Sequence, residues 1–276
     1  MKYKILYPEI PNMGDLLNRD LLESFFHIQV ERGGFVTSNM SAIGSGLEKI
    51  QWATNISKKM IKQIAYYPFA AREFHVWGTG FLRYSQKDNA FYYPKIDFHC
   101  LRGKLTQNRV ESIINKKIDV PLADGGLLAE RWVGSQQKKY DIGIIPHFRE
   151  RDHQLIEKLH EHFDNSIVIN LKEDPRTVVE TIGSCKYVLS SSLHGLIVAD
   201  SFHIPNMHIM LYPFGERVKG DGYKFSDYYS SYGLEDNFYV IDPDNLPSLK
   251  KIEESYRIDD TAVEKKKDQL ISAFPR

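Results

Sequence analysis

The chain has 276 residues, of which 42% are hydrophobic and 26% are charged, as in an ordinary globular protein. Lysine plus arginine and aspartate plus glutamate each number 36, so the net charge is zero and a broad basic surface for nucleic acid is not expected. The two cysteines, Cys100 and Cys185, lie beside apolar runs, which favours buried thiols over a disulfide framework.

The first half of the chain alternates short apolar runs with helical patterns. The apolar runs predict strands at Tyr3–Tyr7, Ser41–Ile43, Phe74–Trp77 and Phe98–Leu101. Apolar residues that recur on one face predict helices at Asp15–Val30 and Gly103–Asn115. The first of these helices is expected to end at Gly33–Gly34.

The polar stretch Gly134–Lys139 interrupts this pattern, and the alternation then starts again. Strands are predicted at Tyr140–Ile145, Ile167–Asn170, Lys186–Ser190 and Met207–Leu211. Helices are predicted at Asp152–Phe163, Pro175–Gly183, Leu193–Phe202 and within Leu249–Phe274. This alternation predicts an α/β fold with two Rossmann-like domains, residues 1–134 and 135–276. The last helix either crosses back to the first domain or lies as a solvated surface helix.

Small and polar residues follow nearly every predicted strand. They are Asn12-Met13-Gly14-Asp15, Gly44-Ser45-Gly46, Gly78-Thr79-Gly80, Arg102-Gly103, Asp124-Gly125-Gly126, Pro146-His147 and Ser190–Gly195. Ligands of parallel sheets bind outside the carboxyl ends of the strands, where small residues let them approach backbone N–H groups. One glycine turn means little, since tight connections use glycine anyway, but the whole set predicts a site between the two domains.

His194 is the strongest single candidate for chemistry. It lies at the predicted start of a helix, directly after a strand. A helix N-terminus lowers the pKa of a histidine and a bound anion raises it, so this imidazole could donate or accept a proton near neutral pH. The alternative is a buried histidine hydrogen-bonded to the backbone.

Several other kinds of site lack their motifs. His160 and His162 are two residues apart and would point to different sides of a helix, and no His-Glu-x-x-His or Cys-x-x-Cys is present. No Gly-x-x-x-x-Gly-Lys phosphate loop and no Gly-x-Ser-x-Gly elbow occur either. A metal enzyme, an ATPase and a serine hydrolase are therefore not expected.

Taken in order, the motifs resemble those of the polysaccharide pyruvyl transferases, in particular the branch that decorates bacterial exopolysaccharides and capsules. The block Ser191-Ser192-Leu193-His194-Gly195 with Ala199-Asp200 and Ile204-Pro205 is the most specific. The other matching pieces are Asn12–Leu16, Ile43–Leu47, Val76–Phe81, Leu101–Thr106, Ala123–Leu128, Ile142–His147 and Lys224–Tyr229.

The resemblance implies an enzyme with a fold like the glycosyltransferase-B enzymes, which transfers the enolpyruvyl part of phosphoenolpyruvate to a sugar as a pyruvate ketal. The donor would lie mainly against the second domain and the acceptor against the first. No metal and no nucleotide cofactor are implied. Many members carry Arg-Leu-His-Gly where this chain has Ser192, a serine that the exopolysaccharide branch shares, so the donor anion must be held by other groups.

Roles follow for the residues at the strand ends. His194 is expected to act as general acid and Asp15 as base or orienter for the attacking hydroxyl. The expected donor-binding residues are Arg102, Lys224, Ser191, Ser192, Leu193, His147 and Arg149, with Arg217 as a further cation. The expected acceptor-binding residues are Asn12, Gly14, Gly78 and Thr79.

Two other functions remain open at this point. A nucleotide-sugar glycosyltransferase of the same architecture could use Asp200 on a ribose. A non-catalytic sugar-binding relative is kept open by Ser192. The identity of the sugar, its hydroxyl pair and the form of the acceptor are not predicted.

The stretch 51–71 bears on location. It has no acidic residue but contains Lys58, Lys59 and Lys62 among apolar and aromatic residues, a composition that suits an anionic membrane surface. The alternative is an ordinary helix that packs its apolar face. No signal peptide opens the chain and no stretch approaches the ~18 apolar residues of a membrane-spanning helix. We expect a soluble cytoplasmic protein, with peripheral contact to the plasma membrane as the further option.

Overall fold

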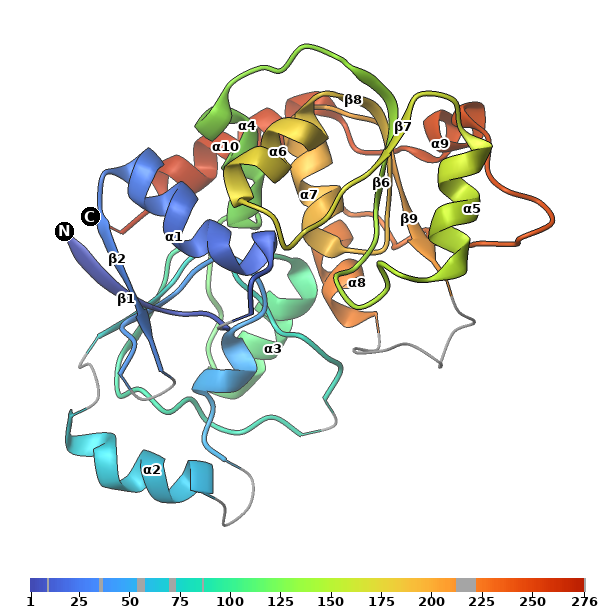
Figure 1. Ribbon diagram of the computed structural model, residues 1–276. Coiled ribbons are helices and arrows are strands. Elements are labelled where there is room, and N and C mark those ends of the chain that lie inside the picture. The colour runs from blue at the N-terminus through green and yellow to red at the C-terminus, as the bar shows by residue number, and fades with distance from the viewer. Residues whose placement is uncertain are drawn as a thin grey trace.

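The protein is an α/β protein with two parallel sheets of five strands each (Figure 1). The computed structural model describes residues 1–8, 10–34, 37–53, 58–69, 73–85, 87–211 and 222–275. Within these ranges one sheet belongs to each half of the chain.

The first sheet has the strand order β2-β1-β3-β4-β5. Its strands are β1 (Lys2–Leu6), β2 (Gln29–Gly33), β3 (Met40–Ser41), β4 (Phe74–Val76) and β5 (Ile96–Phe98). The helices of this half are α1 (Met13–Phe26), α2 (Lys58–Tyr66), α3 (Lys104–Ile114) and α4 (Ala129–Val133), with short 3-10 helices η1 (Leu47–Ile50), η2 (Tyr67–Phe69) and η3 (Gly125–Leu128).

The second sheet has the strand order β10-β9-β8-β6-β7. Its strands are β6 (Tyr140–Ile145), β7 (Ser166–Val168), β8 (Cys185–Ser190), β9 (Asn206–Met210) and β10 (Tyr239–Val240). The helices are α5 (Gln154–His162), α6 (Pro175–Gly183), α7 (Leu193–Ser201), α8 (Tyr223–Ser230), α9 (Leu249–Ser255) and α10 (Asp260–Ser272).

Both sheets follow one topology. Counted from the first strand of each sheet, the order is 2-1-3-4-5, as in doubly wound sheets of the flavodoxin type. The strand order reverses between β1 and β3 in the first sheet and between β6 and β8 in the second. These reversals are the points where such sheets bind ligands.

Alternating side chains of β6 separate the apolar layers. Ile142 and Ile144 belong to a cluster with residues of α5 and α9, whereas Ile145 belongs to a cluster with residues of α6 and α7. The second cluster also contains Leu17 of α1 and Trp77 from the first half. One continuous apolar layer therefore joins the two halves, and Figure 1 shows α1, α4, α6, α7 and α10 between the two sheets.

The C-terminal segment packs against the first half. The indole Nε1 of Trp77 donates a hydrogen bond to the carbonyl of Leu270 at 2.9 Å. The rings of Phe26 and Phe274 stack with centroids 3.8 Å apart. Figure 1 shows the two chain ends close together. The division of the chain at residue 134 remains a prediction.

The first predicted helix, Asp15–Val30, is wrong at its C-terminal end. Helix α1 ends at Phe26 because His27 takes a left-handed conformation with φ 52°. The chain then enters β2, in which Val30 is buried. The hydrophobic periodicity did not reveal this turn, because Ile28 and Val30 continue the apolar repeat of the helix. Both residues are β-branched and also suit a strand. The strand β10 and the helix α8 were also not predicted.

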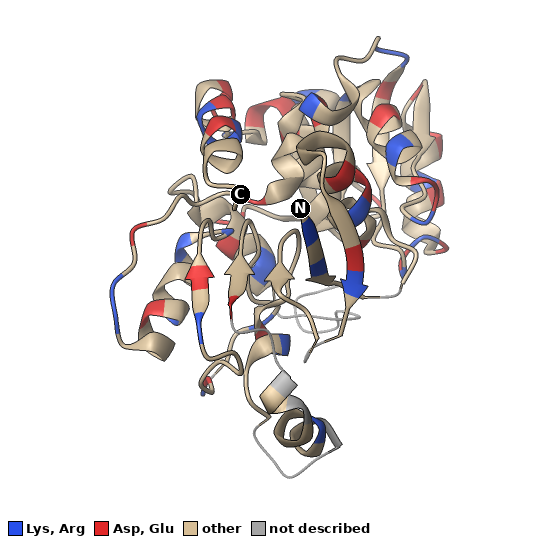
Figure 2. Ribbon diagram, turned by 90° about the vertical axis from the view of Figure 1, so that its left-hand side faces the viewer, with Lys and Arg blue, Asp and Glu red and all other residues tan. Residues whose placement is uncertain are grey.

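Charges of both signs are spread over both halves, as Figure 2 shows. Among the helices of the described ranges, none is long and apolar enough to span a bilayer. Cys100 and Cys185 are buried free thiols, as expected.

Candidate functional site

A cleft of about 180 Å³ lies at the strand-order reversals of both sheets. The first half contributes the segments after β1 and β3, and the second half contributes the segments after β6 and β8. Its lining residues are Leu6, Tyr7, Pro8, Asn12, Asp15, Ile43, Gly44, Ser45, Gly46, Lys49, Leu82, His147, Phe148, Ser192, Leu193, His194 and Lys224.

The imidazole of His194 fits against glycines from the other half. A Cβ atom added to Gly14 would lie 2.1 Å from Nδ1 of His194, so only glycine leaves room for the ring there. Cβ atoms at Gly44 and Gly126 would each lie 3.7 Å from the ring. Three segments of the first half, the start of α1, the loop after β3 and η3, therefore surround a side chain that helix α7 of the second half supplies.

The imidazole of His194 is neutral in the free protein. Burial, with the charges of Lys224 and Arg102 adding to it, lowers the pKa of His194 to about 3. Its Nε2 atom is buried and has no hydrogen-bond partner in the described structure. A buried polar atom without a partner is costly, so Nε2 is an atom that a ligand or water would satisfy.

Asp15 lies on the opposite wall, in the first turn of α1. Asn12 donates a hydrogen bond from Nδ2 to Oδ2 of Asp15 at 3.0 Å. Burial raises the pKa of the Asp15 carboxyl, and the Asn12 bond and the charges of Lys49 and Lys224 partly offset this. Lys224 lines the same cleft as Asp15 and His194, and its positive charge acts to lower the pKa of both side chains.

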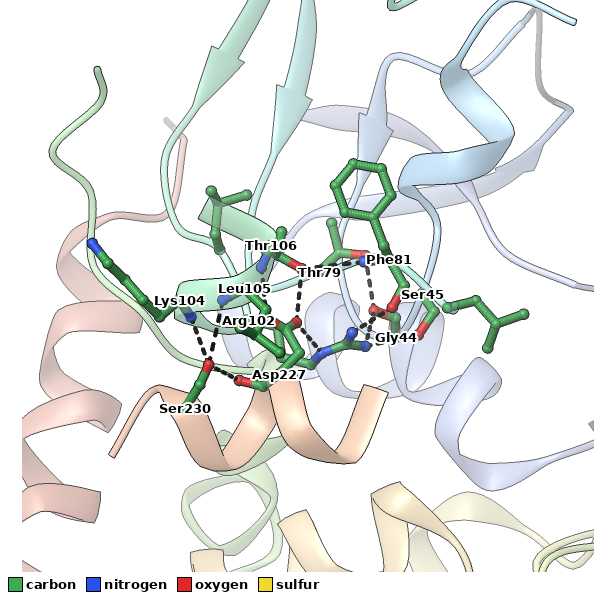
Figure 3. Close-up of polar contacts among 12 residues, drawn as sticks. Gly44, Ser45, Thr79, Phe81, Arg102, Lys104, Leu105, Thr106, Asp227 and Ser230 are labelled. Carbon is green, nitrogen blue, oxygen red and sulfur yellow. Dashed lines mark hydrogen bonds and ion pairs between the residues drawn. The ribbon is translucent and has the colours of Figure 1, made fainter. Parts of the chain in front are cut away.

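Arg102 lies behind the cleft rather than in it. Its side chain is fully buried and donates from Nε to Oδ2 of Asp227 at 2.8 Å, as Figure 3 shows. Nη1 donates to Oγ of Ser45 at 2.7 Å and Nη2 donates to the carbonyl of Phe81. Arg102 thereby supports the loop that lines the cleft, and its predicted contact with the donor stays a prediction.

The same network joins the two halves. Asp227, on α8, accepts hydrogen bonds from the backbone N–H and the hydroxyl of Thr106, each at 2.7 Å (Figure 3). A Cβ atom at Gly103 would lie 1.7 Å from the carbonyl oxygen of Asp227. This close approach requires glycine and fixes α8, the helix that carries Lys224.

Gly78 and Thr79 are predicted to bind the acceptor. In the structure they pack against neighbouring backbone segments of the first half. Thr79 is fully buried and donates from Oγ1 to the carbonyl of Gly44 at 2.9 Å. Gly78 has φ +65°, and a Cβ atom there would lie 2.7 Å from the backbone nitrogen of Gly125. Neither lines the cleft, whereas the predicted Asn12 does, and Gly14 packs under His194.

Some of the predicted donor-binding residues line the cleft and others do not. His147, Ser192, Leu193 and Lys224 line the cleft. Ser191 does not: its hydroxyl accepts the His147 N–H at 2.9 Å and donates to Glu150, so it holds the loop after β6.

Arg149, another predicted donor-binding cation, is not among the residues that line the cleft. Arg149 is exposed, with its guanidinium 5.3 Å from the ring centroid of Phe148. Arg217 falls outside the described residues.

Lys49 and Asn18 are site residues that the motifs did not reveal. Lys49 lies on η1 and lines the cleft. Its position shortly after the strand end at Gly44-Ser45-Gly46 could have indicated in the sequence that it lies near the site. Asn18 is fully buried, donates from Nδ2 to the carbonyl of Ile43 and accepts the Ile43 N–H on Oδ1, both at 2.9 Å. It thereby pins α1, with Asp15, to the loop after β3.

Asp200, the ribose contact of the alternative function, is committed elsewhere. Its buried carboxylate accepts hydrogen bonds from Asn206 at 2.6 Å, Tyr228 at 2.7 Å and Tyr256 at 3.2 Å. It does not line the cleft. Among the described residues no group of three or more histidine, cysteine or acidic side chains could hold a metal ion.

Asp124 is a fully buried residue near His194. One oxygen, Oδ1, accepts the Gly126 N–H at 2.9 Å, and the other, Oδ2, has no hydrogen-bond partner among the described residues. A Cβ at Gly126 would lie 3.2 Å from Oδ1 of Asp124 and 3.7 Å from Cδ2 of His194, so the two side chains are neighbours. Burial, against the opposing charge of Arg102, raises the pKa of Asp124 to about 7.

We expect Asp124 to make the stability of the protein depend on pH. The folded protein keeps this proton up to about pH 7, whereas the unfolded chain releases it near pH ~4, so stability falls as the pH rises between these values. Asp124→Asn should reduce the fall in the free energy of unfolding between pH 5 and pH 8, measured by urea denaturation. The exposed Asp119→Asn is the control. An unchanged pH slope in Asp124→Asn would contradict the assignment.

Three comparisons with known proteins found a family model, a similar viral protein and a solved structure that aligns weakly. An uncharacterized protein of Acanthamoeba polyphaga mimivirus is 29% identical over 213 residues, which cover 71% of this chain and 70% of that protein. A crystal structure of a functionally uncharacterized protein from Klebsiella pneumoniae aligns with 87% of this chain and 93% of its own, at a TM-score of 0.46 and 13% identity.

The family model of the polysaccharide pyruvyl transferases matches residues 42–210. The matched segment contains the loops after β3, β6 and β8, and therefore His194, while Asp15 and Lys224 lie outside it. The match covers more than half of the chain and confirms the family that the motifs predicted. The chain belongs to the polysaccharide pyruvyl transferase family.

Proposed function

We propose that the protein transfers the enolpyruvyl part of phosphoenolpyruvate to a sugar of a polysaccharide, or of its lipid-linked precursor, and closes a pyruvate ketal. The observation that carries this proposal is the cleft. There the imidazole of His194 and the carboxyl of Asp15 come from opposite halves, and Lys49 and Lys224 line the same cleft. We also propose that the halves are arranged as in the glycosyltransferase-B enzymes, with the donor mainly against the second half.

The donor carries a carboxylate and a phosphate, so its binding requires cations or convergent N–H donors. Lys224 and Lys49 supply cations at the cleft. The N-terminus of α7, where the N-cap residue Ser192 makes no side-chain cap hydrogen bond, adds backbone N–H groups and the positive end of the helix dipole. These groups favour an anion beside His194.

Proton transfer follows from the two side chains. A bound dianion raises the pKa of His194, which is about 3 in the free protein, so the imidazole takes up a proton as the donor binds. His194 then protonates the methylene carbon, which becomes a methyl group and leaves C2 electrophilic. One sugar hydroxyl adds to C2, the bond from C2 to the phosphate oxygen breaks, and a second hydroxyl closes the ketal.

The proposed reaction balances in protons. The two hydroxyls release two protons, of which one replaces the proton that His194 gave to carbon and the other leaves with phosphate. In this scheme Asp15 accepts the hydroxyl proton, and the raised pKa that burial gives its carboxyl supports a role as base. No metal or nucleotide cofactor enters this scheme.

The size of the cleft favours a small donor. Its volume of about 180 Å³ is below the roughly 300–1,000 Å³ typical of sites for drug-sized ligands. A nucleotide sugar would need more room, and Asp200 does not reach the cleft to meet a ribose.

Incubation with phosphoenolpyruvate and a panel of galactose, glucose and N-acetylmannosamine glycosides tests the proposal. We expect release of phosphate together with a new ketal methyl signal by NMR. Turnover of a nucleotide sugar without phosphoenolpyruvate would support the glycosyltransferase alternative instead. Binding of phosphoenolpyruvate without phosphate release, across the whole panel, would support a non-catalytic binding protein.

A further inference from the structure

Helix α2 stands out from the body of the protein. Figures 1 and 2 both show it as a projection at one end of the molecule. It is held through the fully buried Gln63, whose Nε2 donates to the carbonyl of Gln51 at 3.0 Å and whose Oε1 accepts the Ala53 N–H at 2.9 Å. The Tyr92 hydroxyl donates to the Gln63 carbonyl at 3.1 Å. The inner side of this helix is therefore attached by a polar residue.

The outer side of α2 is apolar. The side chains of Ile61 and Ile64, one turn apart, are 61% and 63% exposed. Tyr67, which follows the helix, is 44% exposed. An ordinary surface helix buries its apolar residues and exposes its polar ones. The expectation that this helix packs its apolar face into the protein is therefore wrong for both isoleucines.

The charged residues of α2 and of the sequence on either side of it have one sign. Lys58, Lys59 and Lys62 belong to α2, and no acidic residue occurs from Gln51 to Ala71. Lys62 is exposed beside the two isoleucines. A second copy of the chain would bring lysines against lysines, so self-association through this face is disfavoured. An anionic lipid surface offers both the apolar layer and the opposite charge.

We propose that α2 docks the protein on an anionic lipid bilayer. Ile61 and Ile64 enter the boundary between headgroups and acyl chains, the lysines contact the anionic headgroups, and Tyr67 lies at the interface, where aromatic rings are favoured. The helix lies on the surface and does not cross it.

Helix α2 is connected to the cleft through a short segment of the chain. Gln51, which binds Gln63 of α2, is two residues after Lys49, which lines the cleft. Docking would hold the cleft at a set distance from the lipid surface. The proposal rests on the exposed face and its charge and does not require the proposed transferase activity.

Flotation of the full chain with vesicles tests the proposal. We expect binding to vesicles of phosphatidylcholine with phosphatidylglycerol, and much weaker binding to phosphatidylcholine alone. Each lysine near an anionic surface contributes about fivefold to partitioning, so Lys58→Gln/Lys59→Gln/Lys62→Gln should lose roughly 100-fold. Ile61→Ser/Ile64→Ser should lose at least ~10-fold through the lost apolar contact.

The matched controls carry the same substitutions elsewhere. Val240→Ser removes an apolar residue that is 43% exposed on β10, and Lys158→Gln/Lys250→Gln/Lys251→Gln removes three exposed lysines of α5 and α9. Both should float as the unaltered chain does. Circular dichroism should show the same fold for every variant. No flotation with anionic vesicles, equal loss in the controls, or a dimer that Ile61→Ser/Ile64→Ser dissociates would overturn the proposal.

Discussion

Replacing Asp227 by alanine is expected to lower the free energy of unfolding by about 3–5 kcal/mol, because it leaves the Arg102 guanidinium charged and unpaired in the interior. Both side chains are 0% exposed and are joined at 2.8 Å. The change also removes the acceptor of both Thr106 hydrogen bonds. Urea denaturation, with comparison of midpoint and slope, measures the loss.

An exposed ion pair is the control for this experiment. Arg176 and Glu180 lie 3.0 Å apart with side chains that are 51% and 40% exposed, and Glu180→Ala should cost less than about 1 kcal/mol. An equally small effect of Asp227→Ala would show that the buried pair does not hold the halves together. A variant Arg102→Lys of full stability with a raised KM for phosphoenolpyruvate would instead restore Arg102 as a donor contact.

His194→Gln is expected to lower the rate of phosphate release from phosphoenolpyruvate by about 100- to 10,000-fold with the fold retained, because general acid catalysis is lost. Glutamine is similar in size to the imidazole, so the packing against Gly14 remains. The control is His160→Gln, which changes an exposed histidine of α5 that binds Ser166. Near-native turnover in His194→Gln would remove His194 from the mechanism.

Gly14→Ala provides a second route to the same conclusion. The new methyl group would lie 2.1 Å from the present position of the His194 Nδ1 atom, so the ring must move. Alanine is at least as good as glycine within a helix, so α1 should form. We expect a fall in turnover without a comparable loss of stability, and an unchanged rate would mean that the position of the ring is not important.

The secondary structure was predicted best where local signals mark both ends of an element. Strand β6 and helix α6 match their predicted bounds, Tyr140–Ile145 and Pro175–Gly183. In α6, Pro175 occupies the first turn and Asp174 accepts the Thr177 N–H at 3.0 Å, a cap that the local sequence encodes. The predicted end of helix α1 lies four residues too late. The helix ends where His27 takes a left-handed conformation, and a non-glycine residue gives little sequence signal for such a turn.

Strand ends of parallel sheets meet at one edge, so the motifs alone indicate that His194, Asp15 and Asn12 come together, and all three line one cleft. The same motifs could not separate lining residues from supporting ones. Arg102 turns inward because it meets Asp227, a residue 125 positions later in the chain. Gly14 leaves room for the imidazole of His194, which comes from the other half of the chain. Such pairings depend on how the two sheets pack, which no local pattern carries, because buried charges and close contacts are satisfied by neighbours in space and not in sequence.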